Sequence, residues 1–284
     1  MDEAQSSKAS EPMATAAIPA PLGFIEPHAT LLRQPEAGQQ LYKLMRAEHL
    51  LSSIENSYLH FNRVDSYGDF DGADQKDGEQ LPADREINSG IGFEKAPEFT
   101  AAHYYDQSRA RTYACCFALK SDEHIWETYG SGGARGRVAV IFNFGWLRRH
   151  LNAQMEAGTL TMEGVPCRQI FSINYGIVDY VDHNAHRLNI EQLPNPICYS
   201  YLKAERFRAE HELRVTLSAI GVGKFAFGGQ VKDLPVSLTV AFDFRAAMAE
   251  GGIVSLEAGP DCDEAWLAVE LAKLGIGRGA RSKG

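Results

Sequence analysis

Apolar and polar residues alternate in several short stretches of this chain, a period-two pattern that is typical of β-strands. The stretches are rich in Val, Ile, Phe and Tyr, which favour strands. We expect strands at residues 41–45, 58–61, 111–119, 137–144, 167–176, 211–218, 234–244 and 253–259. Apolar residues three and four positions apart instead predict helices. These are expected at residues 46–57, near 95–108, at 145–158 and at 264–275.

The order of these elements favours an α+β fold. Strands outnumber long helices and do not alternate strictly with them, which argues against a parallel, doubly wound sheet. We therefore expect a mixed or largely antiparallel sheet flanked by helices. Residues 1–38 are rich in Ala, Pro, Ser, Gln and Glu without a sustained period, as in a flexible tail. The predicted organisation is a disordered tail over residues 1–38 and a single α+β domain over residues 39–284.

The overall charge narrows the classes of partner. The 284 residues carry a formal net charge of -9, which argues against binding nucleic acid through bulk charge, although Arg206, Arg208 and Arg214 could form a local basic groove. No apolar run is long enough to predict a membrane-spanning helix, and the acidic start does not fit a signal peptide. Five cysteines without paired spacing indicate a reducing compartment. We expect a cytoplasmic protein with no membrane partner.

Metal-binding and nucleophilic motifs are weak in this sequence. His183 and His186 lie three positions apart near Asp179, but no cluster of carboxylates or cysteines complements them. The acidic loop at residues 69–78 has the composition of a calcium loop, but its twelfth position is Gln80 instead of Glu. No G-x-S-x-G motif occurs. We therefore expect no metal site and a solvated acidic loop.

The stretch RAEHELRVTL, residues 208–217, places two carboxylates two positions apart at the start of a predicted strand. An extended chain would put Glu210 and Glu212 on one face and His211 on the other. A solvated strand edge would explain the pair, with Arg214 as a salt-bridge partner. Alternatively, one carboxylate could hold a sugar hydroxyl while its neighbour orients or deprotonates a nucleophile. Both interpretations stay open at this point.

Two longer patterns accompany the pair. Aromatic and glycine residues precede the strand through Phe142, and a basic residue and an aromatic residue precede the carboxylates. The residues concerned are Trp126, Tyr129 and Gly136 in the first pattern, and Lys203, Phe207, Glu210, Glu212 and Arg214 in the second. With LYK at residues 41–43 and YLHFNRVDSYGDFDG at residues 58–72, they resemble the bacterial family called domain of unknown function 2971, over about residues 40–276. That resemblance implies no biochemistry.

The order of the parts is also similar to the Arg–Ser–Glu pattern of ADP-ribosyltransferases. A basic residue follows a Tyr, aromatic and Ser residues precede a strand, and F-x-x-E-x-E comes last. The resemblance implies a fold like that of ADP-ribosyltransferases, with a sheet that can be split, and NAD as substrate. It implies that Glu212 is catalytic and Glu210 accessory. The residues that it implies around NAD are Tyr42, Lys43, Arg46, Trp126, Tyr129 and Ser131.

Some of these positions depart from the family pattern. Lys43 stands where the family has Arg and cannot make a planar two-pronged phosphate contact, so Arg46 could supply that contact instead. Ser131 lies in YGSGG where the family has Ser-Thr-Ser. The aromatic residues Trp126 and Tyr129 would stack on the nicotinamide or close its pocket. The departures affect the NAD pocket more than the carboxylate pair.

The expected function is cleavage of the nicotinamide–ribose bond of NAD and transfer of ADP-ribose to a macromolecular acceptor. Negative charge near the sugar would stabilise the oxocarbenium-like transition state. The acidic net charge favours a protein acceptor over nucleic acid. Such enzymes act as toxins, effectors delivered into another cell, or defence proteins.

Two alternatives come from other classes. The first is a catalytically inactive relative that binds a nucleotide or a partner protein, which the Lys43 departure favours. The second is a metal-dependent nuclease or hydrolase, for which Asp69, Asp71 and Asp74 would have to converge on Glu210.

Overall fold

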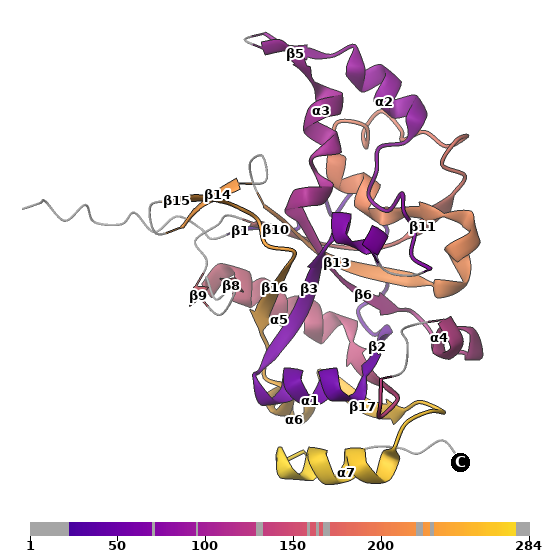
Figure 1. Ribbon diagram of the computed structural model, residues 1–284, viewed down its shortest axis with the longest axis vertical. Helices are drawn as coiled ribbons and strands as arrows, with labels where there is room; N and C mark the ends of the chain where they lie inside the picture. Colours follow the sequence, from indigo (N-terminus) through magenta and orange to yellow (C-terminus); the bar gives the residue numbers. More distant parts are fainter. Residues whose placement is uncertain are drawn as a thin grey trace, which may run out of the picture.

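The computed structural model describes residues 23–69, 72–94, 96–128, 133–157, 160–162, 165–166, 171–219, 224–227 and 230–276. Within these ranges, one mixed sheet of 11 strands forms the centre of the molecule and helices flank it (Figure 1). This arrangement confirms the α+β class and the mixed sheet that the order of elements predicts.

The sheet brings together strands that are far apart in the sequence. Its main path runs, in spatial order, through β1 (Gly23–Ile25), β10 (Phe171–Ile177), β13 (Glu212–Ala219), β6 (Thr112–Ala118), β3 (Tyr58–Arg63), β16 (Ser237–Ala241), β8 (Leu160–Met162) and β9 (Val165–Pro166). A branch leaves this path through β2 (Gln40–Arg46), β7 (Arg137–Asn143) and β17 (Ile253–Ala258). Only the β1–β10 pair is parallel within the described part of this sheet.

Helices and short strand pairs complete the described structure. The α-helices are α1 (Ala47–Glu55), α2 (Pro82–Ser89), α3 (Ala101–Asp106), α4 (Glu123–Thr128), α5 (Phe144–Ala157), α6 (Phe244–Ala249) and α7 (Glu264–Lys273). The 3-10 helices are η1 (Val64–Asp69), η2 (Arg109–Arg111), η3 (Pro196–Tyr201) and η4 (Glu205–Glu210). The paired short strands are β4 (Gly92–Phe93) with β5 (Ala96–Thr100), β11 (Asp179–Val181) with β12 (Leu202–Ala204), and β14 (Lys224–Phe227) with β15 (Gln230–Asp233).

Two expectations need correction. The flexible tail does not extend to residue 38, because β1 pairs with β10 and Glu26 bonds to Arg148 of α5. These contacts are made with distant residues, so local composition could not predict them. The helix expected near 95–108 is helical only in α3, since β5 occupies the residues before it. Residues 1–22 lie outside the described ranges.

The sheet is split along one edge of β6. At one end of β6, Tyr113 and Ala114 pair with β3; at the other end, Ala118 pairs with Tyr42 of β2. Neither strand pairs with Cys116 between them. The Lys43 ammonium donates to the Cys116 carbonyl oxygen across 3.4 Å, so a side chain satisfies a backbone acceptor that a continuous sheet would bond.

The two faces of the central strands differ in chemistry. Alternate residues of β6 and β13, such as Phe117 and Val215, join one apolar core with α1, α5 and α6. The other face carries polar residues, including Arg214 and Thr216, that are nonetheless buried. A layer formed by residues 64–69, 72–94, 96–111 and 178–210 contacts this polar face and has a smaller apolar core of its own. We call this layer the cover.

A close approach between β7 and β17 depends on a glycine. Gly136 has a φ of 79°, and a Cβ there would lie 2.1 Å from the Asp261 carbonyl oxygen. Gly251 has a similar φ of 75°, but its Cβ would meet nothing within 4 Å. A side chain at either position would strain the backbone, but only a side chain at position 136 would also overlap with a neighbouring atom.

We predict that Gly136→Ala lowers the free energy of unfolding by about 3 kcal/mol or more, because strain and overlap add. Gly251→Ala, the matched control, should cost about 1–2 kcal/mol from backbone strain alone. Urea denaturation of both variants measures the difference. Equal losses would mean that the contact with Asp261 relaxes freely.

Candidate functional site

The carboxylate pair does not lie on a continuous extended strand, which corrects the sequence expectation. Glu210 ends the 3-10 helix η4, and His211 adopts a left-handed conformation with φ 44° and ψ 48°. The strand β13 begins only at Glu212. The Leu119 amide donates to the His211 carbonyl, which anchors this turn to the end of β6. The two carboxylates nevertheless converge, because both contact the Lys203 ammonium.

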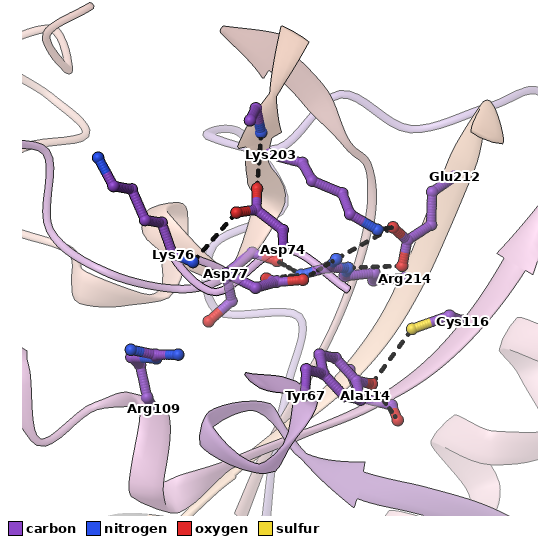
Figure 2. A network of polar contacts seen from close by, with 12 residues as sticks. Tyr67, Asp74, Lys76, Asp77, Arg109, Ala114, Cys116, Lys203, Glu212 and Arg214 are labelled. Carbon is purple, nitrogen blue, oxygen red and sulfur yellow. Dashed lines mark hydrogen bonds and ion pairs between the residues drawn. The ribbon is translucent and has the colours of Figure 1, made fainter. Parts of the chain in front are cut away.

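Arg214 is the centre of this site (Figure 2). Its guanidinium donates to both oxygens of Glu212, with Nε–Oε1 at 2.7 Å and Nη2–Oε2 at 3.0 Å. It also donates to both oxygens of Asp77, at 2.5 and 2.7 Å, and to the Ser200 carbonyl at 2.9 Å. The ring of Tyr67 lies 5.8 Å from the guanidinium carbon. Two-pronged contacts of this kind are the strongest geometry for an Arg–carboxylate pair.

The contacts continue from Glu212 to the rim of the cover. The Lys203 ammonium lies 3.3 Å from Glu212 Oε2 and also bonds Glu210. We call Asp77, Arg214, Glu212, Lys203 and Glu210 the ion-pair chain. It joins the cover to β13 and contains three carboxylates and two cations. Its members become more exposed toward Glu210, whose side chain is 15% exposed, while Glu212 and Arg214 are each 1% exposed.

A second carboxylate holds the loop that carries Asp77. The Asp74 side chain accepts from the Lys76 amide at 3.0 Å and from the Ala204 amide at 2.9 Å (Figure 2). Asp74 is buried, and its bonds fix the loop before α2 against β12. The acidic loop is therefore not simply solvated where it reaches Asp74 and Asp77. Asp77 supplies a negative charge for Arg214, and Asp74 accepts hydrogen bonds from backbone amides of the cover.

Burial and neighbouring charges act in opposite directions on the titration of these groups. Burial raises the pKa of Glu212, but the charges of Arg214 and Lys203 and the hydrogen bonds from Arg214 outweigh it, so that pKa lies well below its ordinary value. Burial and the Glu212 charge raise the pKa of Glu210 despite Lys203. Burial lowers the pKa of Lys203, but the charges of Glu212 and Glu210 outweigh burial, so that pKa lies above its ordinary value. Glu212 is thus ionised and both of its oxygens are engaged.

The basic residue implied by the transferase resemblance lies on the wrong face for a shared site with Glu212. Tyr42, Ala118 and Glu212 are paired in register across three strands, so their side chains share one face. Lys43, the next residue, points to the other face. Its ammonium lies 5.2 Å from the centre of the Phe117 ring, which belongs to the apolar core. Lys43 and Glu212 are therefore not brought together.

Two further predicted residues, Arg46 and Trp126, lie near the other end of β2. Arg46 ends β2 and precedes α1, on the Tyr42 face by alternation. Trp126 lies in α4, where its indole nitrogen donates to the Ser121 hydroxyl at 3.0 Å. The ring packs against Gly259, where a Cβ would come within 2.7 Å. Tyr129 and Ser131 lie outside the described residues.

Trp126 borders a surface hollow of about 330 Å³. The hollow is lined by Asp122, Glu123, Trp126, Glu257, Ala258, Gly259, Pro260, Cys262 and Glu264. We call it the Trp126 hollow. Its lining contains four carboxylates and neither Lys nor Arg; Lys120 pairs with Asp122 at 2.8 Å. Glu257 pairs with Ala139, and Ala139 pairs with Leu44, so Glu257 lies on the Tyr42 face of the sheet and the hollow borders that face. Burial and the charge of Glu257 raise the pKa of the Tyr42 phenol.

The metal-enzyme alternative finds no support in the described ranges. No group of three or more His, Cys, Asp or Glu side chains there is arranged to hold a metal ion. Asp74 is bonded to backbone amides, while Arg214 neutralises Asp77. Asp71 lies outside the described residues.

Sequence reasoning missed two members of the ion-pair chain as site residues, Asp77 and Lys203. One signal shows that Arg214 needs buried partners, although it does not identify all of them. Arg214 occupies a strand between Leu213 and Val215, and a charge within a buried strand requires buried counter-charge. The spacing alone identifies Glu212 as one partner. It does not identify Asp77, which is distant in the sequence.

We predict that Arg214→Met lowers the free energy of unfolding by about 3–5 kcal/mol, because two buried carboxylates lose their cation. The matched control is Arg33→Met, which breaks an exposed pair with Asp179 and should cost less than about 1 kcal/mol. Denaturant unfolding of both variants measures the two costs. A cost below about 1 kcal/mol for Arg214→Met would show that the ion-pair chain contributes little to the stability of the folded protein.

Comparisons with known proteins add no relative: no family model, no curated protein and no solved structure matches this chain. The likeness to domain of unknown function 2971 and to ADP-ribosyltransferases therefore stays a prediction from motifs. Of the helices in the described ranges, none is both long and apolar enough to cross a membrane.

Proposed function

We propose that this protein is a non-catalytic binding protein, and that its ligand is a small organic cation, or the amine or guanidinium side chain of a partner, held in the Trp126 hollow. The observation that carries the proposal is the lining of that hollow, which contains the Trp126 indole and four carboxylates. This corresponds to the inactive-relative alternative, with the ligand class changed from a nucleotide to a cation.

The state of Glu212 supports a non-catalytic protein. A catalytic carboxylate needs an approach to the ribose and a free oxygen to act on it. Glu212 is 1% exposed and its oxygens accept from Arg214 and Lys203. Its role in the described structure is to neutralise these two cations and attach the cover to β13.

The charge of the hollow supports a cationic ligand. Asp122 in the lining pairs with Lys120, and Asp261 and Asp263 beside it pair with Arg137 and Arg135. The remaining carboxylates of the lining, Glu123, Glu257 and Glu264, face no Lys or Arg within it and give it a negative potential. That potential attracts ammonium and guanidinium groups and repels the diphosphate of NAD. The face of an indole adds a cation–π attraction of about 0.5–2 kcal/mol.

We predict that agmatine, a small molecule with an amine and a guanidinium, binds the full chain and that ADP-ribose does not. Glu264→Gln should weaken agmatine binding about threefold to tenfold, because it removes a carboxylate from the lining. Glu127→Gln, on the same short helix as Trp126 but outside the lining, should leave it unchanged. Isothermal titration calorimetry measures all three. Absence of agmatine binding, or binding of ADP-ribose in its place, contradicts the proposal.

An ADP-ribosyltransferase that uses NAD is the second candidate, favoured by a specific observation. The split sheet holds Tyr42 and Glu212 on one face, on either side of β6, and the Trp126 hollow borders that face. For this chemistry, Glu212 would have to leave Arg214 before it could contact a ribose. Transfer to a protein acceptor would then follow the expectation from the motifs.

Incubation with NAD labelled in the nicotinamide separates the two candidates. We predict no nicotinamide release above the protein-free blank, because Glu212 stays in its ion pairs. Release by the wild type that is lost in a folded Glu212→Gln variant, checked by circular dichroism, would establish cleavage of the nicotinamide–ribose bond through Glu212 and reject the binding proposal. Release that persists in Glu212→Gln would indicate a different catalytic group and would also reject it.

A further inference from the structure

A compact arm projects from the molecule at the end away from α7 (Figure 1). It consists of α2, β4, β5 and α3, described over residues 82–94 and 96–106. Gln80, two residues before α2, joins the helices of the arm: its amide donates to the Ala102 carbonyl at 2.8 Å and to Asp106 at 2.7 Å, and Asn88 donates to Gln80 at 3.0 Å. Buried hydrogen bonds therefore hold the two helices of the arm in a defined arrangement.

Large apolar side chains are exposed on this arm. Ile87 is 44% exposed, Ile91 51% and Phe93 46%. The Phe93 ring lies 5.8 Å from the Phe99 ring, which in turn stacks on His103. We call Ile87, Ile91, Phe93 and Phe99 the arm face. Exposed apolar residues that are grouped on a projecting element, instead of scattered singly, are typical of interaction surfaces.

Acidic residues lie between and beside these apolar residues. Glu86, Glu94 and Glu98 are exposed. The only Lys or Arg of the described arm residues is Arg85, which pairs with Asp106 at 2.9 Å. The described part of the arm therefore carries three exposed carboxylates together with its exposed apolar residues, while Lys95, which follows Glu94 in the sequence, lies outside the described residues.

We propose that the arm face is a docking site for a basic amphipathic segment of a partner protein, with apolar residues on one side and Lys or Arg beside them. The apolar side would cover Ile91 and Phe93, and the cations would meet Glu94 and Glu98. Charge complementarity selects this occupant. A second copy of the chain would bring carboxylates of the same sign together. This site is separate from the Trp126 hollow and goes beyond the proposed function.

The probe is a fluorescein-labelled amphipathic helix of Leu and Lys, titrated with the full chain and followed by fluorescence anisotropy. Two comparison peptides have the same composition in scrambled order, without an apolar side, and Glu in place of Lys. We expect the Leu–Lys helix to bind about tenfold more tightly than either comparison peptide. Added salt should weaken it, since exposed charges are screened.

Exposed positions offer variants that keep the fold. Phe93→Ser should weaken the Leu–Lys helix about tenfold, and the double change Glu94→Gln with Glu98→Gln about threefold with a reduced salt dependence. Val254→Ser, at an exposed position on β17, is the matched control and should change nothing. Saturating agmatine should not displace the peptide.

Four outcomes would overturn the proposal. They are equal binding of the scrambled peptide, no effect of Phe93→Ser, displacement by agmatine, and a dimer in sedimentation velocity that Phe93→Ser abolishes. The third would assign the peptide to the Trp126 hollow, and the fourth would assign the arm face to a second copy.

Discussion

The buried guanidinium of Arg214 is the interaction on which the cover depends. A cation in this position is costly unless hydrogen-bonded carboxylates surround it. Asp77 comes from the loop before α2, Glu212 from the start of β13, and the Ser200 carbonyl from η3. One side chain therefore requires three separate segments to meet over the polar face of the sheet. Lys203 extends the same requirement to Glu210.

This requirement determines what the carboxylate pair can do. Ionised Glu212 is favoured because two cations face it, and the same cations leave it no free oxygen in a buried setting. A group that stabilises the folded state in this way is poorly placed to change partners during catalysis. Groups that can meet a ligand without breaking the cover are found elsewhere, in the Trp126 hollow and on the arm face.

The sequence predicts the local elements well and their partners poorly. Short runs rich in apolar, β-branched and aromatic residues identify β2, β3, β6 and β7, because each strand has one side in the apolar core. They cannot identify β1, whose stability comes from pairing with β10, more than a hundred residues away. The left-handed turn at His211 was also missed, because that conformation is uncommon outside glycine. The face of Lys43 relative to Glu212 follows from the pairing of both Tyr42 and Glu212 with Ala118, which is a long-range property of the sheet.

The spacing of Glu212 and Arg214 on β13 favours an ion pair between them, whatever family the motif resembles. Residues two apart on a strand share a face, and the long Arg side chain can reach back to the carboxylate. In a buried strand such as β13, neither charge has water as an alternative partner, so Glu212 and Arg214 pair as soon as the cover closes. Assigning catalysis to Glu212 therefore also requires a second arrangement in which another anion holds Arg214. Asp77 alone already binds two of its nitrogens, but release of Glu212 would leave Nε without that partner inside the protein. Because of this cost, the pair acts first as a determinant of the fold, and any catalytic role must overcome it.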